Sequence, residues 1–149
     1  MSEDNLLPKD TNRSLPIALL RAREAVMSQF RPMLARHGFN EQQWRVIRVL
    51  SESGAIDQTE LAERASLLGP SLTRIVANLS QRELVTQKRD EADQRRRLIA
   101  LTAKGEETIS AILPQSQAIY AGLEEHIGKD KIAALLDLLE EVTRAGKAN

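Results

Sequence analysis

The sequence has no cysteine, and its only two histidines, His37 and His126, lie far apart along the chain. These shortages exclude disulfides and cysteine-ligated zinc, and they leave little for a His-based metal site or a catalytic triad. Aromatic residues make up only 3% of the 149 residues, so a core must consist mainly of aliphatic side chains, which favours helices. The seven glycines form no phosphate-binding loop, the polar N-terminus lacks a signal peptide, and no apolar run is long enough to span a membrane. We therefore expect a cytoplasmic protein of mainly α (α+β) type that is not an enzyme, needs no cofactor and has no membrane partner.

Charge is unevenly distributed along the chain, although the formal net charge is zero. Residues 71–104 contain eight Lys or Arg and four Asp or Glu, whereas residues 105–149 contain four and eight. A basic segment followed by an acidic one is typical of a local anion-binding surface. A basic cluster of this size can also be an ordinary solvated face, so charge alone leaves both interpretations open.

The N-terminal third predicts an arm followed by a long helix. Residues 1–14 are polar and are interpreted as a flexible arm. From Leu15 onward, apolar residues recur at intervals of three and four, which indicates one face of a helix. Pro32 lies inside this pattern and predicts a kink, and Gly38 is suited to end the helix in a left-handed conformation.

Three further helices follow, each with a start signal. Asn40 and Gln43 have the spacing of a capping box, and Gly54 ends the helix that they begin. Asp57 can cap a third helix, and Pro70 can open a fourth because proline is tolerated in a first turn.

The periodicity changes after this fourth helix. Residues 85–89 and 97–101 are strand-like, and the charged link 90–96 between them predicts a hairpin with a long tip. Thr102 then caps a fifth helix, and Gly128 separates it from a sixth.

Two short helices joined by a tight turn and followed by a basic hairpin form a winged helix-turn-helix, which we place at residues 40–102. A helix fits the major groove of double-stranded DNA, and an arginine on a hairpin tip fits a narrow minor groove. Taken singly, Ser71 and Thr73 can be simple helix caps and Arg74 can be merely solvated, but the consecutive order of the elements favours DNA. Asp93 can pair with a neighbouring arginine and shape the tip. The predicted DNA-binding residues are Pro70, Ser71, Thr73, Arg74, Asn78, Arg89, Asp93, Arg95 and Arg96.

The flanking helices are more apolar than one small winged domain requires. We assign residues 15–54 and 103–149, chiefly 15–37 and 103–149, to a dimerisation region. A homodimer matches the two-fold symmetry of a palindromic operator. The alternative at this point is a monomer whose two ends pack together.

A second class of function competes with DNA binding. A helical protein-interaction module without sequence-specific DNA binding would use the long helices and leave the hairpin without a role. Salt-dependent binding to duplex DNA would distinguish the two functions, because phosphate contacts make affinity fall steeply with salt.

Five segments together resemble the MarR family of transcriptional regulators, namely Asn40–Ile47, Leu61-Ala62, Pro70–Arg74, Asp93–Arg95 and Leu98–Gly105. The resemblance implies a homodimer of winged lobes on a helical dimerisation platform. It also implies repression of a catabolic operon and release from DNA when a small aromatic acid binds. The wing arginine of the family then corresponds to Arg95, and the recognition helix to residues 70–82.

A narrower resemblance lies in Ile17–Ala25 and Phe30–Pro32. These segments are similar to a branch of the family that controls the degradation of aromatic acids. The similarity implies 4-hydroxyphenylacetate or 3,4-dihydroxyphenylacetate (homoprotocatechuate) as the effector. The turn Leu68–Ser71 departs from the commoner family pattern, because it carries a proline at the start of the recognition helix.

A small aromatic carboxylate needs a cation for its carboxylate and a surface for its ring. Arginine is suited to bind a carboxylate through two hydrogen bonds. In the family, the site lies where the dimerisation helices meet the DNA-binding lobe. Each candidate also has an ordinary structural role, such as a core tryptophan or a paired arginine. The candidate ligand-binding residues are Arg21, Arg23, His37, Trp44, Arg45 and Arg48.

Overall fold

The computed structural model describes residues 10–148, which form two compact units that meet between Ile112 and Leu113. Most of the predicted N-terminal arm lies outside the described residues. Its last part, Thr11–Arg13, is a short 3-10 helix (η2), which Asp10 caps by accepting a 2.9 Å hydrogen bond from the Asn12 amide. These residues are therefore helical where the sequence suggested loose chain.

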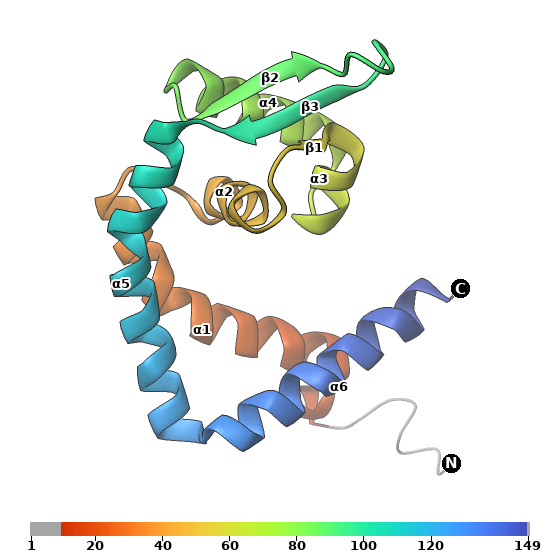
Figure 1. Cartoon of the computed structure of the whole chain (residues 1–149). Helices are drawn as coiled ribbons and strands as arrows, with labels where there is room; N and C mark the ends of the chain where they lie inside the picture. Colours follow the sequence, from red (N-terminus) through yellow and green to blue (C-terminus); the bar gives the residue numbers. More distant parts are fainter. Residues whose placement is uncertain (1–9, 149) are drawn as a thin grey trace. The chain divides into compact units, whose positions relative to one another are not determined.

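The first unit is a winged helix-turn-helix preceded by one long helix (Figure 1). Its mainly α character agrees with the class expected from the sequence. In chain order the helices and strands of the protein are α1 (Leu15–Arg36), α2 (Glu41–Ser53), β1 (Ile56–Asp57), α3 (Gln58–Arg64), α4 (Gly69–Gln81), β2 (Val85–Arg89), β3 (Arg97–Leu101), α5 (Ala103–Ile127) and α6 (Lys129–Lys147).

Local capping signals determine where the helices of the first unit begin. The Gln43 amide donates to the Asn40 side chain and the Asn40 amide donates to the Gln43 side chain, at 2.8 and 3.0 Å, so the predicted capping box is confirmed. Asp57 accepts from the Glu60 amide at 2.8 Å and begins α3. α1 continues through Pro32, and the kink expected there stays a prediction.

The sheet has three antiparallel strands in the order β1–β3–β2. β2 and β3 have the predicted bounds, and their register runs from Val85 opposite Leu101 to Arg89 opposite Arg97. The sequence analysis missed β1, because a strand of two residues is too short to show alternation.

α4 packs against α2, α3 and β2 through its apolar face. Leu72, Val76 and Leu79 on that face are at most 2% exposed, as the spacing predicted. Ile47 of α2 and Ile99 of β3 are completely buried in the same unit. The opposite side of α4 is thereby left toward solvent.

The wing is joined to α5 at a closely packed junction. The Thr102 amide donates to the Leu84 carbonyl at 3.0 Å, and the Thr102 hydroxyl accepts from the Gly105 amide at 3.0 Å, which confirms the predicted cap. A Cβ atom on Gly105 would overlap the Leu84 carbonyl oxygen. Glycine is therefore required sterically at this point.

The second unit contains the remainder of α5 and α6, which are separated at Gly128 with φ of 101°. Several of its large apolar side chains are exposed, including Tyr120, Leu135, Leu136 and Leu138. Among the described residues no helix combines the length and the apolar character that a bilayer crossing requires.

We expect Gly105→Ala to destabilise the protein by about 1–3 kcal/mol, because the new methyl group collides with backbone that is itself hydrogen bonded. Urea unfolding followed by circular dichroism measures the change. Gly122→Ala is the matched control on the same helix, because a Cβ there meets nothing within 4 Å in the described chain. Equal effects of the two substitutions would contradict the steric explanation.

Candidate nucleic-acid interface and ligand-binding region

The outer side of α4 presents polar and cationic side chains to solvent. Arg74 and Asn78 are exposed, and Ser71 is half-buried. Arg74 has no hydrogen-bond or ion-pair partner among residues 10–148, so its guanidinium is available to an external acceptor. Leu68 precedes α4 without a side-chain cap, and Pro70 stands in the first turn.

Two of the predicted contact residues of α4 also hold this helix within the fold. The Thr73 hydroxyl accepts from Gln58 Nε2 at 2.8 Å and donates to the Gly69 carbonyl at 3.0 Å. Asn78 Oδ1 accepts from Gln43 Nε2 at 3.1 Å. Thr73 therefore joins α4 to α3, and Asn78 joins it to α2. The amide hydrogens of Asn78 remain as donors for an external group.

The hairpin tip is shaped by Asp93, as the sequence suggested. Asp93 Oδ1 accepts from the Arg95 amide at 3.1 Å and lies 3.8 Å from Arg95 Nε, while the Arg96 amide donates to the Asp93 carbonyl at 2.9 Å. The Arg95 side chain is 97% exposed. The tip thus holds its own backbone in place and projects one arginine into solvent.

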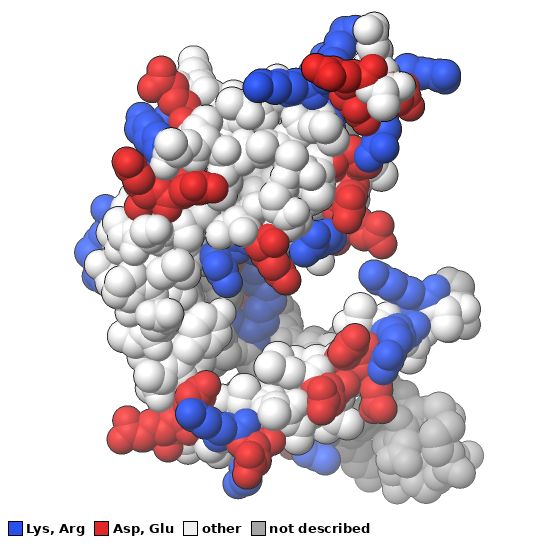
Figure 2. Space-filling view, viewed as in Figure 1, with Lys and Arg blue, Asp and Glu red and all other residues white. Residues whose placement is uncertain are grey.

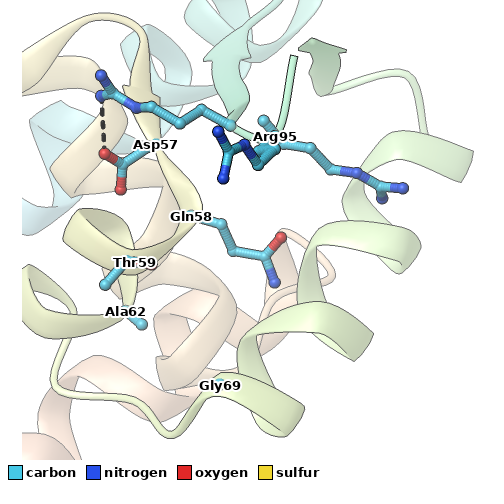
Figure 3. A pocket seen from close by; sticks show the side chains of 8 residues that line it. Asp57, Gln58, Thr59, Ala62, Gly69 and Arg95 are labelled. Atoms are coloured by element: carbon cyan, nitrogen blue, oxygen red, sulfur yellow. Dashed lines mark hydrogen bonds and ion pairs between the residues drawn. The ribbon is translucent and has the colours of Figure 1, made fainter. Parts of the chain in front are cut away.

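Arg96 behaves differently from its neighbour. Its Nη2 lies 2.8 Å from Asp57 Oδ2, the ion pair drawn as a dashed line in Figure 3, and its Nη1 lies 3.9 Å from Asp90 Oδ2. The sequence analysis placed Arg96 among the DNA-binding side chains, whereas the structure commits its guanidinium to two carboxylates of the protein. Proximity in sequence to Arg95 could not reveal this partner.

The two hairpin stems carry a pair of arginines that face each other. Arg89 and Arg97 are direct partners in the register, and neither has an ion-pair partner among the described residues. Like charges directly opposite in a sheet are unfavourable unless an anion lies between them. With Gln87 and Lys88 they line a cavity of about 220 Å³. The sequence analysis left out Arg97 as a site residue, although the cross-strand register of the predicted hairpin pairs it with Arg89.

A larger cleft of about 600 Å³ lies between the wing and the helices. Asp57, Gln58 and Gly69 line one part of it and Arg95 to Arg97 the other (Figure 3). Figure 2 shows cationic side chains gathered at the end of the hairpin, with carboxylates among them. The cleft combines a helix start with several cations, a chemistry that suits a phosphate backbone.

A network of four charged side chains connects α1 to the start of α2. Arg23 Nη2 lies 2.6 Å from Glu41 Oε1, Arg31 Nε lies 3.3 Å from Glu41 Oε2, and Arg31 Nη1 lies 2.8 Å from Glu24. The hydrogen bond from Arg23, aided by Arg31, lowers the pKa of Glu41 against the opposing effect of burial. The bond with Arg31 likewise lowers the pKa of Glu24 and raises that of Arg31.

The structure places the ligand-binding candidates on α1, on α2 and at the end of α1, in different environments. Arg23 lies at the α1–α2 junction through its bond with Glu41, whereas Arg21, two residues away on the same helix, points to a different side. Trp44 is 8% exposed on α2, and Arg48 follows it by one helical turn.

Two candidates have environments that the sequence could not show. Arg45 is half-buried, and its Nε is fully buried with no hydrogen-bond partner among the described residues. Such a donor favours an acceptor from outside the described chain. His37 is half-buried at the end of α1, where its amide donates to the Leu34 carbonyl at 3.0 Å.

Comparison with known proteins identifies the family of this chain. A profile of the MarR family matches residues 37–96, which include α2, α4 and the hairpin tip. The homoprotocatechuate degradative operon repressor of Escherichia coli is 42% identical over 135 residues, 91% of each chain. The chain belongs to the MarR family. The HTH-type transcriptional regulator FarR of Neisseria gonorrhoeae is 41% identical over 131 residues, 88% of this chain and 90% of that one. NadR, in its crystal structure with 4-hydroxyphenylacetate, is 41% identical in sequence to this chain. The two structures superpose with a TM-score of 0.81 over 90% of this chain and 95% of NadR.

Membership of the MarR family decides between the two classes of function that the sequence left open. The protein is a DNA-binding transcriptional regulator, not an enzyme and not a helical interaction module. DNA binding is therefore the function of the winged helix-turn-helix. In this fold α4 has the place of the recognition helix, and the β2–β3 hairpin is the wing.

We expect Arg95→Ala to weaken operator binding by about 1–3 kcal/mol, the cost of losing a cationic contact with DNA. Helicity should not change, because the side chain is 97% exposed. Fluorescence anisotropy on operator DNA measures the affinity, and Arg36→Ala, at the exposed end of α1, is the control. Unchanged affinity of a normally folded Arg95→Ala protein would remove the wing tip from the interface.

The charge network predicts a pH dependence with a definite sign. Because the folded pKa of Glu41 is lowered, its contribution to stability is present above the ordinary glutamate pKa and is lost as pH falls through the folded value. Arg23→Ala should raise the Glu41 pKa toward its ordinary value, which NMR titration of the carboxyl carbon measures. Arg21→Ala should leave that pKa unchanged, and an equal rise in both variants would refute the specific Arg23–Glu41 pairing.

Proposed function

We propose that this protein represses an operon for the degradation of an aromatic acid and acts on DNA in the cytoplasm. The single observation that carries the proposal is its 42% identity, over 91% of both chains, with a homoprotocatechuate degradative operon repressor. The NadR complex with 4-hydroxyphenylacetate supports the same class of ligand. A small phenolic carboxylate, 4-hydroxyphenylacetate or 3,4-dihydroxyphenylacetate, then releases the repressor from its operator.

We further propose that the repressor is a homodimer on a palindromic operator. In the second unit Tyr120 is 57% exposed, and Leu136 and Leu138 of α6 are 60% and 58% exposed. Burying these side chains against a second copy would remove their apolar surface from water and so stabilise the dimer. Two winged lobes related by two-fold symmetry match the two half-sites of a palindrome.

Arg23 is the residue that we assign to the effector carboxylate. It already binds a carboxylate, that of Glu41, at 2.6 Å, so its guanidinium is oriented for this chemistry. An effector carboxylate would replace Glu41, and the aromatic ring would lie against the Trp44 region of α2. Arg45, with its unpartnered buried Nε, is the second cation of this proposal. Arg21, His37 and Arg48 remain candidates for further contacts.

A short chain of contacts leads from this junction to the recognition helix. Glu41 and Gln43 share the first turn of α2. The Gln43 side chain completes the capping box with Asn40 and also donates to Asn78 of α4 at 3.1 Å. Displacing Glu41 from Arg23 would therefore disturb the turn that holds α4, which supports release of DNA by an anion bound at Arg23.

The proposal is tested by titrating the protein onto its own promoter DNA, with and without each of the two acids. We expect tight, salt-sensitive binding that at least one acid reverses. Arg23→Ala should weaken effector binding about tenfold or more, because a hydrogen bond to a charged group contributes about 1.5–3 kcal/mol. Isothermal calorimetry measures the effector affinity.

Arg36→Ala, at the exposed end of α1, is the control and should retain both effector binding and DNA affinity. Arg23→Ala also removes the Glu41 contact, so it should in addition lower the affinity for DNA without effector. Binding to DNA that neither acid disturbs would refute the assignment to an arylacetate operon. Full effector affinity in Arg23→Ala would refute the role of that arginine alone.

A further inference from the structure

We propose that Arg96 is a positioning residue, which fixes the wing tip over the first turn of α3 so that the neighbouring Arg95 reaches the minor groove. Arg96 acts in this way through Asp57 and Asp90, without contacting DNA itself. The inference rests on the proposed insertion of Arg95 into DNA.

The hairpin tip has little else to determine its direction. The β2–β3 ladder ends at Arg89 opposite Arg97. Beyond that pair, the Asp90 amide donates to the Arg96 carbonyl at 3.0 Å and the Arg96 amide donates to the Asp93 carbonyl at 2.9 Å. Both bonds close the tip on itself. The contact that joins the described tip residues to the helices is the ion pair between Arg96 Nη2 and Asp57 Oδ2 at 2.8 Å.

Asp57 is a rigid partner for this contact. Its Oδ1 accepts from the Glu60 amide at 2.8 Å as the cap of α3, and its backbone pairs with Leu98 in the sheet. Exposed ion pairs are usually weak, partly because two flexible side chains must be ordered. Here the carboxylate is already held by the cap, and only the arginine has to be ordered. The cap and Arg96 together lower the pKa of Asp57, so the carboxylate is charged at neutral pH.

The position of this ion pair determines the geometry of the cleft of about 600 Å³. Asp57 and Gly69 line its helical part, and Arg95 and Arg96 line its wing part. A winged lobe on DNA must place a helix in the major groove and a tip in the minor groove at one fixed separation. The β1–β3 pairing of Asp57 with Leu98 holds the stem of the wing, and Arg96 joins the tip beyond it to the helical part of the cleft, so Arg96 determines the separation at the tip. The Arg95 side chain stays 97% exposed, with Asp93 Oδ1 3.8 Å from its Nε, and is accessible to DNA.

The competing role for Arg96 is a direct phosphate contact, and the effect of removing Asp57 separates the two. An Arg96 that contacts phosphate would be released by the loss of Asp57 and would bind DNA as well or better, whereas a positioning Arg96 needs Asp57 for its effect. Each cation that leaves a DNA interface reduces the steepness of log K against log salt concentration by about 0.9. Loss of positioning therefore changes the steepness only as far as Arg95 leaves the groove. Loss of positioning should also lower the preference for A·T over G·C pairs under the tip, since narrow A·T grooves attract arginine.

The experiment compares Arg96→Gln, Asp57→Asn, the double variant and Arg95→Gln on operator DNA at several salt concentrations. Asn is as good an N-cap as Asp, so Asp57→Asn removes the ion pair and keeps the start of α3. We expect Arg96→Gln and Asp57→Asn each to weaken binding about tenfold, and the double variant to be no weaker than either. Both should lose A·T preference and reduce the steepness of the salt dependence by the same amount, no more than Arg95→Gln does, and Arg96→Lys should recover part of the affinity. Arg95→Gln should lower the slope.

Two results would overturn the inference. A lower slope in Arg96→Gln, with unchanged or tighter binding in Asp57→Asn, would show that Arg96 contacts DNA and that Asp57 only repels it. An unchanged slope and affinity in Arg95→Gln would remove the wing tip from DNA, so that there would be nothing for Arg96 to position. The Arg95→Gln result would also refute the proposed contact of the wing with DNA, whereas the Arg96→Gln and Asp57→Asn result would leave that contact standing.

Discussion

The burial of one face of α4 determines which side chains of the recognition helix DNA can meet. Leu72, Val76 and Leu79 are almost fully buried against the neighbouring elements, and each contributes about 1.5–3 kcal/mol relative to an exposed position. Rotating α4 about its axis would expose this face, so the helix has one permitted orientation. The hydrogen bonds from Gln58 to Thr73 and from Gln43 to Asn78 then hold α4 in place against α3 and α2. The chemistry offered to DNA follows from how the core is packed.

The wing shows that the number of cations in a segment does not define its function. Arg95, Arg96 and Arg97 are consecutive, yet one is exposed at the tip beside Asp93, one is paired with Asp57 and one faces Arg89 across the ladder. Strand alternation sends neighbouring side chains to opposite faces, and the turn formed by Asp93 changes the direction again. A zero net charge is therefore compatible with a locally cationic DNA-binding surface.

Local rules account for most of what the sequence predicted correctly. Caps at Asn40 and Asp57, the buried face of α4 and both strands of the hairpin depend on residues a few positions apart. The features that it missed depend on residues far apart. β1 exists only because Ile56 finds Ile99, and Arg96 finds its carboxylate 39 residues earlier in the chain. The hairpin pattern already pointed to tip arginines in the minor groove, and the family resemblance singled out Arg95 among them.

The exposure of Arg23 limits how an effector bound there could release DNA from α4. At Arg23, replacing one carboxylate by another exchanges similar charge-assisted bonds, and the Arg23 side chain is 43% exposed, so the exchange itself supplies little free energy. The driving force must then come mainly from burying the aromatic ring, which Glu41 lacks. Burial of the ring thus supplies the free energy that displaces Glu41 from Arg23. Glu41 lies in the same helical turn as Gln43, whose side chain holds α4. A carboxylate without a ring can compete for Arg23, but it has no comparable means of shifting the equilibrium away from the DNA-binding state.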